Sequence, residues 1–213
     1  FRDGVEAVFA GKTTQIQFEI VGLRGRRLFM DQTAAPLFAP DDHGRVVEMV
    51  AVTRNVSAQR RAEADLLQAR LSQGYAVADR PKDALASMER AVALAPTNTD
   101  YLLARAQLAN WIGRRDLAAD SYERVLRLNP DDRTALLMLA RTRMWQGKLD
   151  ASASAYRKYL RTYPDKAEVY LEYAKLESWR GNFDHAIEIL EQYGKKFGNR
   201  PKVDQEEARL YAL

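Results

Sequence analysis

Three tryptophans recur along the chain at intervals of 34 residues: Trp111, Trp145 and Trp179. An indole ring offers a large apolar face and one N–H donor, so a regular row of them could stack on sugar rings or hold a peptide. The alternative is that each indole is wedged between neighbouring structural units as core, which the usual burial of tryptophan favours. The spacing therefore predicts either a binding surface or a repeated core position.

Two basic residues, Arg141 and Lys175, are separated by the same interval. Side chains at such equivalent positions could hold a carboxylate or an acidic peptide, because both cations make charge-assisted hydrogen bonds to an anion. Isolated basic side chains on a helix are, however, usually solvated, and this interpretation is favoured.

Residue types that carry catalysis or bind metals are scarce. His43 and His185 have no partner at ligand spacing, and the absence of cysteine excludes thiolate nucleophiles and cysteine metal sites. No phosphate-binding glycine loop, nucleophile elbow or histidine-based triad occurs. The pairs Asp41–Asp42 and Asp131–Asp132 lie at expected turns, where aspartate caps and bends the chain. We therefore expect no catalytic residue, no cofactor and no metal ion, and do not expect an enzyme.

The composition is that of a globular chain with little net charge. Its 213 residues are 46% hydrophobic, which is enough for a core in one or two domains. The 33 basic and 29 acidic residues leave a net charge of only +4, so a nucleic-acid partner is not expected. No apolar run approaches the roughly 18 residues that span a bilayer. Because the chain begins at Phe1 rather than Met, we expect it to be a piece of a longer protein.

The elements that carry the tryptophans repeat with the same period. Glycines and prolines recur in register with them, at Gly113, Gly147 and Gly181 and at Pro96, Pro130 and Pro164. Between glycine and proline, a small, a large and a medium residue follow at spacings of four and three, as in Ala118, Tyr122 and Val125. Those spacings describe one face of a helix. A 34-residue period of this kind is typical of a helix–turn–helix repeat.

On these motifs residues 65–200 resemble the tetratricopeptide repeat (TPR) family, in four consecutive units. The resemblance implies a mainly α fold: a helical-hairpin solenoid that coils into a right-handed superhelix. Glycine would end the first helix of each unit and proline the second. Three positions depart from the family pattern, where Arg105 replaces a leucine, Asp79 the turn glycine of the first unit, and Ser152 an alanine. Residues 201–213 resemble the first helix of a further unit.

In the TPR family a groove lined by the first helices binds partners, and the resemblance implies such a groove here. One face of the first helices in the second, third and fourth units would line it. The implied residues are Leu103, Gln107, Asn110, Trp111, Leu137, Arg141, Met144, Trp145, Leu171, Lys175, Ser178 and Trp179. The tryptophans would form a row along one rim. The lysine and asparagine set of the family's chaperone-tail clamp is absent, so that partner is not expected.

The first sixty residues have the alternating pattern of β-strands instead. Apolar and polar side chains alternate from Gln15 to Ile20, which predicts a half-buried strand. The expected elements are strands over residues 15–20, 27–37 and 45–55, turns at Gly25 and over 39–44, and a helix over 57–73. Short connections between adjacent strands favour a three-stranded antiparallel sheet.

The segments GRRLFMDQTAAPLF, DDHGRVV and RNVSAQRRAE of this region resemble the C-terminal half of a PAS sensor domain, over residues 1–63. The family closes its last strand with Asp-Ile-Thr, for which this chain has Asn55, Val56 and Ser57. The resemblance implies a PAS-like sheet without the part of the fold that contacts haem or flavin. It divides the chain into domains over residues 1–63 and 64–213. A bare sheet face and edge invite pairing, so a homodimer through the sheet is one expectation.

Two functions remain open. The first is a cytoplasmic, non-enzymatic interaction scaffold within a bacterial signalling or regulatory protein, whose TPR groove binds a peptide or protein. The second is a periplasmic protein of exopolysaccharide export or biofilm formation, because the repeats are similar to those of export proteins with Trp-x-Gly at this turn. In that case the repeats would bind polysaccharide or the export machinery.

Overall fold

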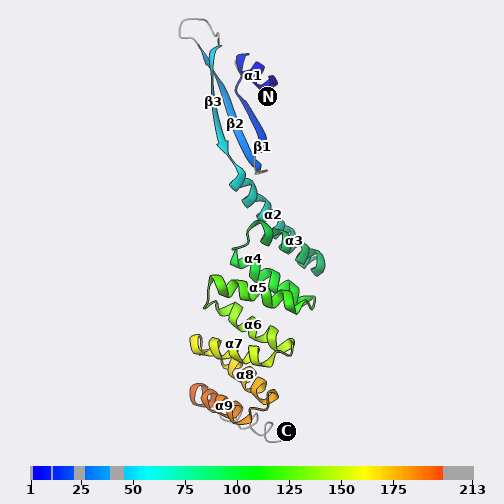
Figure 1. Cartoon of the computed structure of the whole chain (residues 1–213), viewed down its shortest axis with the longest axis vertical. Coiled ribbons are helices and arrows are strands. Elements are labelled where there is room, and N and C mark those ends of the chain that lie inside the picture. The colour runs from blue at the N-terminus through cyan, green and yellow to red at the C-terminus, as the bar shows by residue number, and fades with distance from the viewer. Residues whose placement is uncertain (1, 11, 22–26, 39–45, 199–213) are drawn as a thin grey trace. The chain divides into compact units, whose positions relative to one another are not determined.

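The computed structural model describes residues 2–10, 12–21, 27–38 and 46–198, in two compact units over residues 1–67 and 68–213 (Figure 1). The predicted turns at Gly25 and over 39–44, and the predicted helix over 201–213, lie outside the described residues.

The first unit contains a three-stranded antiparallel sheet in the order β1–β2–β3. The strands are β1 (Thr14–Val21), β2 (Arg27–Phe38) and β3 (Val46–Asn55), which confirms the predicted sheet. In the register Phe18 lies opposite Met30, so apolar residues of the two strands share one face of the sheet.

More of the sheet is covered by other residues than the strand pattern alone predicts. A helix that the sequence analysis missed, α1 (Arg2–Phe9), contacts all three strands and buries Val8 completely. On the face that bears Asp31, the Gln15 amide donates to both carboxylate oxygens of Asp31 at 2.9 Å, and Arg54 pairs with Asp31 at 3.7 Å. The polar side chains on that face therefore pair with one another, whereas Val52 on the same face is 58% exposed.

The third strand passes directly into α2 (Ser57–Val77), at the residue where the helix was predicted to begin. The Asn55 side-chain oxygen accepts a hydrogen bond from the Ser57 N–H at 3.0 Å. The Ser57 hydroxyl in turn accepts one from the Phe29 N–H at 2.8 Å. These bonds satisfy the first free N–H of the helix and fasten the junction to β2.

The second unit is a row of antiparallel helices, which confirms the predicted helical repeats (Figure 1). After α2 follow α3 (Pro81–Leu94), α4 (Thr99–Trp111), α5 (Arg115–Leu128), α6 (Arg133–Trp145), α7 (Leu149–Thr162), α8 (Ala167–Trp179) and α9 (Phe183–Phe197). The pairs α4–α5, α6–α7 and α8–α9 pack most closely, and each helix from α3 onwards contacts the next.

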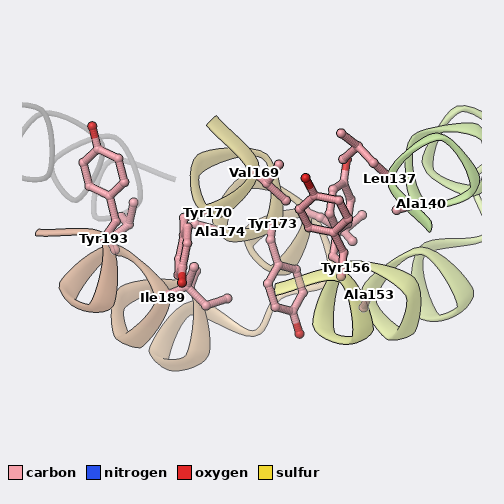
Figure 2. Packing of buried hydrophobic residues seen from close by; sticks show 14 of the residues in the cluster. Leu137, Ala140, Ala153, Tyr156, Val169, Tyr170, Tyr173, Ala174, Ile189 and Tyr193 are labelled. Atoms are coloured by element: carbon pink, nitrogen blue, oxygen red, sulfur yellow. The ribbon is translucent and has the colours of Figure 1, made fainter. Parts of the chain in front are cut away.

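The predicted small–large–medium face of each second helix is the core. Ala118, Tyr122 and Val125 of α5 are completely buried. Figure 2 shows the corresponding cluster of the last repeats, in which Tyr156 of α7 stacks on Tyr173 of α8 with ring centroids 5.8 Å apart. Such aromatic pairs add stability beyond the apolar area that they bury.

Basic side chains also tie consecutive repeats together at equivalent positions. Arg124 of α5 donates to the carbonyl of Pro96 at 3.0 Å, and Lys158 of α7 donates to the carbonyl of Pro130. Donors and acceptors are both 34 residues apart, so the same contact recurs at two successive unit boundaries. We call these two contacts the backward hydrogen bonds.

Arg105, which stands where the family pattern has leucine, is 8% exposed and fully engaged. Its Nε donates to the Ser121 hydroxyl at 2.9 Å and its Nη2 to Asp120 at 2.8 Å. Burial lowers the pKa of the Arg105 guanidinium, the charge of Arg124 adds to this effect, and Asp120 opposes it. An ion pair thus replaces an apolar contact inside the repeat.

We expect Asp120→Ala to lower the free energy of unfolding by about 1–3 kcal/mol, because it leaves Arg105 buried without its carboxylate. Arg105→Leu removes the buried charge as well and restores the family residue, so it should be neutral or stabilising. Urea denaturation of both variants measures the difference. A greater loss from Arg105→Leu than from Asp120→Ala would contradict this account.

The turn between the helices of a pair needs a left-handed backbone. Gly113, Gly147 and Gly181 have φ values of 81°, 74° and 77°, and Asp79 has φ of 53° at the equivalent position of the first repeat. A side chain in this region costs roughly 1–2 kcal/mol.

Asp79→Gly should therefore raise the free energy of unfolding by about 0.5–1 kcal/mol. The matched exchange is Gly113→Ala, which should destabilise through the backbone alone, since an added Cβ there meets no atom within 4 Å. Denaturant midpoints of the two variants test both signs. The explanation fails if Asp79→Gly is destabilising.

Candidate binding surfaces of the helical repeats

The three tryptophans are exposed rather than wedged into the core. Trp111, Trp145 and Trp179 are 56%, 49% and 53% exposed, so the interpretation of these residues as core is wrong. Each is the last residue of its helix, α4, α6 and α8 respectively. The chain turns away immediately afterwards, and the side chain is left at the helix end.

The other residues of the predicted groove differ in how accessible they are. The exposed ones are Gln107 and Lys175, the partly buried ones are Leu103, Asn110, Arg141, Met144 and Leu171, and the buried ones are Leu137 and Ser178. A ligand could therefore contact the exposed and partly buried members directly. The two buried residues support the helices.

Arg141 forms an ion pair with a carboxylate of the next repeat, Glu172. Its Nε and Nη2 donate to the two carboxylate oxygens of Glu172 at 2.9 and 2.6 Å, and Tyr156 donates to the same carboxylate at 2.9 Å. The hydrogen bonds to Glu172 raise the pKa of the Arg141 guanidinium, and burial raises that of the Tyr156 hydroxyl. An incoming carboxylate would have to displace Glu172.

Lys175 lies in a different environment although it is equivalent in sequence. It is exposed, and its Nζ lies 5.1 Å from the centroid of the Trp179 ring, as in a cation–π contact. The two aligned basic residues therefore do not form a matching pair, and Lys175 is the one that remains accessible.

Two further groove residues make polar contacts. The Asn110 amide donates to the Thr142 hydroxyl at 2.9 Å, which joins α4 to α6. The Ser178 hydroxyl donates to the carbonyl of Lys175 within α8 at 2.7 Å. These contacts hold the first helices in place and do not involve the neighbouring indoles.

A pocket of about 720 Å³ opens beside Trp145. The residues that line it come from the turn between α4 and α5 with the start of α5, and from the end of α6 with the turn that follows it: Gly113, Arg114, Arg115, Asp116, Leu117, Trp145, Gln146 and Lys148. We call it the turn pocket. Of the predicted groove residues only Trp145 lines this pocket. The remaining lining residues could not be predicted from one repeat, because they come from two successive repeats.

A buried carboxylate is a second feature that the sequence analysis missed. Glu177 of α8 is completely buried and accepts hydrogen bonds from Arg180 and from Asn182 at 2.7 Å. Arg180 also donates to Asp150 of α7 at 2.6 Å. The four side chains brace the last two repeats. No group of three or more metal-binding side chains occurs among the described residues.

No helix in the described part of the chain is long and apolar enough to cross a membrane.

Two family models, both described as tetratricopeptide repeat, match residues 101–167 and 146–210. Residues 101–210 therefore belong to the tetratricopeptide repeat family. No curated protein matches the sequence.

Solved structures with the same fold include a MamA protein, with a TM-score of 0.60 at 20% identity over 69% of this chain and 79% of the other. YrrB, titled a TPR protein with an unusual peptide-binding site, has a TM-score of 0.60 at 18% identity, with 69% and 76% covered. The first TPR of Spaghetti (RPAP3), bound to an HSP90 peptide, has a TM-score of 0.51 at 17% identity, with 56% and 94% covered. At these identities the likeness concerns the fold.

Proposed function

We propose that the chain is a non-enzymatic scaffold whose helical repeats bind a peptide or protein partner. The observation that carries the proposal is the row of half-exposed indoles at Trp111, Trp145 and Trp179. Keeping three large apolar rings in water at equivalent helix ends is unfavourable unless a partner covers them. Tryptophan is also among the residues that contribute most to protein interfaces.

The peptide-binding site named for YrrB and the peptide bound to the TPR of RPAP3 support a peptide or protein as the ligand class. The predicted groove residues, with Gln107, Lys175 and the three indoles as their exposed members, are the proposed contact surface.

Site-specific photo-crosslinking tests this function. A photoreactive phenylalanine analogue replaces Gln107, on the predicted groove, or the exposed Arg157 on the second helix α7 as a matched control. We expect Gln107 to yield a defined protein adduct in the native host cell and Arg157 to yield none. Equal labelling at both positions, or no protein adduct at Gln107, contradicts the proposal.

A polysaccharide ligand is the second candidate, because exposed indoles also stack on sugar rings. It fits a periplasmic export or biofilm role, as the peptide ligand fits a cytoplasmic signalling role. Titration with neutral and acidic oligosaccharides, followed by tryptophan fluorescence, separates the two candidates. Saturable binding of an oligosaccharide that is lost when the tryptophans are replaced would favour the polysaccharide ligand.

For the first unit we propose a PAS-like sensor segment that pairs with a second copy. The Asn55–Ser57 junction to α2 and the exposed Val52 on β3 support this. Light scattering after size-exclusion chromatography measures the mass. Twice the 24.2 kDa of one chain, reduced to one chain mass by Val52→Lys, is expected, whereas a single chain mass at high concentration contradicts the pairing.

A further inference from the structure

We propose that the turn pocket is a separate subsite that holds an acidic side chain of a peptide, with the indole of Trp145 covering the apolar residue beside it. The inference rests on the proposed peptide-binding function but concerns a different surface from the predicted groove. Only Trp145 belongs to both.

The charges around the turn pocket favour an anion. Arg114, Arg115 and Lys148 line it together with a single carboxylate, Asp116. That carboxylate is already engaged, since Gln146 donates to it at 2.8 Å and Lys148 lies 3.6 Å from it. The lining therefore carries an excess of positive charge that a peptide carboxylate would balance.

Arg115 is the cation most available to a ligand. It is exposed, and it makes no ion pair or side-chain hydrogen bond with any residue that the structure describes. Arg114, by comparison, has a partner in Glu89 at 3.5 Å. A guanidinium without a partner can bind a carboxylate through two hydrogen bonds without first losing another contact.

The wall formed by Trp145 and Gln146 is held in place before a ligand arrives. The Gln146 oxygen accepts from Arg143 at 3.0 Å while its amide nitrogen donates to Asp116. Trp145 ends α6, and the turn that follows contains Gly147 with φ of 74°. A prearranged wall reduces the ordering cost of binding.

An acidic peptide matches both the cations and the indole of the turn pocket, whereas inorganic phosphate or a neutral sugar matches only one of them. Inorganic phosphate would meet the cations but leave the indole uncovered. A neutral sugar would cover the indole but leave the excess positive charge without a counterpart. A peptide that alternates acidic and apolar residues supplies a carboxylate and an apolar side chain at neighbouring positions.

The experiment uses the full chain with Trp111→Phe and Trp179→Phe, which leaves Trp145 as the sole tryptophan of the three. The probe is a blocked hexapeptide of alternating glutamate and leucine, titrated while the Trp145 fluorescence is recorded. We expect a saturable shift that weakens about tenfold with Arg115→Ala. Arg127→Ala, an exposed arginine in the last turn of the same helix, is the matched control and should change nothing. The glutamine counterpart of the peptide should bind about tenfold more weakly.

The inference is overturned if Arg115→Ala and Arg127→Ala behave alike, if the glutamine peptide binds as well, or if no saturable shift occurs at millimolar peptide. It is also overturned if a uronate oligosaccharide or inorganic phosphate binds more tightly than the peptide. Its failure is distinguishable from failure of the proposed function, because the photo-crosslink at Gln107 reports on the groove and does not depend on Arg115.

Discussion

Replacing Glu177 by alanine is expected to lower the free energy of unfolding by about 3 kcal/mol. The carboxylate is completely buried. Its removal leaves the Asn182 amide without its acceptor and breaks the ion pair between Glu177 and Arg180. Arg180 keeps Asp150 as a partner, which holds the cost at the lower end of the range for a broken buried pair. Glu188→Ala, at an exposed position of α9, is the control and should change stability by less than about 0.5 kcal/mol.

The same residue makes the free energy of unfolding of the helical repeats depend on pH, in a direction that follows from its pKa. Burial alone would raise the pKa of Glu177, but the hydrogen bonds from Asn182 and Arg180 outweigh it, and the pKa lies below its usual value of 4.5. A folded pKa below the unfolded one adds stability that is present above pH 4.5 and lost as the pH falls through the folded value. The stability gap between wild type and Glu177→Gln should therefore narrow in acid. A gap that stays constant down to acid unfolding would contradict this.

Tyr156→Ala is expected to cost about 3–5 kcal/mol, since it empties a completely buried aromatic position of the core. The ring stacks on Tyr173 (Figure 2). The Tyr156 hydroxyl donates to Glu172. Tyr156→Phe keeps the ring, and Glu172 still accepts from Arg141, so only about 1 kcal/mol should be lost. Equilibrium denaturation followed by far-ultraviolet circular dichroism measures both changes.

Tyr193→Phe is the control for the hydroxyl, because Tyr193 is also buried but its hydroxyl makes no hydrogen bond to any described residue. It should be neutral. If Tyr156→Phe proved equally neutral, the Tyr156–Glu172 hydrogen bond would contribute nothing to stability.

The repeats could be predicted from the sequence because each buried position recurs at a fixed interval. Ala118, Tyr122 and Val125 are completely buried as their spacing predicted, and the turn glycines have the expected left-handed backbone. Sheet strands were predictable from simple alternation. In contrast, α1 is only eight residues long, which is too short to show a clear helical period in the sequence, although Val8 in it is completely buried.

The environment of each site residue was harder to predict, because it depends on partners that the repeat does not dictate. Arg141 and Lys175 are equivalent in sequence, yet Glu172 pairs with the first and no carboxylate pairs with the second among the described residues. The average burial of tryptophan was also misleading for Trp145, since that average does not describe the last residue of a helix. The turn pocket combines residues of two turns, so no single motif contains it.

The backward hydrogen bonds couple each repeat to the one before it. Arg124 and Lys158 each reach towards the amino end and hold the last carbonyl of the repeat before their own. Each bond joins two neighbouring repeats, so removing the terminal repeat breaks one such bond, and the repeat that then becomes terminal loses either the donor or the acceptor of that bond. The unfolding of a terminal repeat thus loosens the repeat next to it, so the stack should fray from its ends inwards.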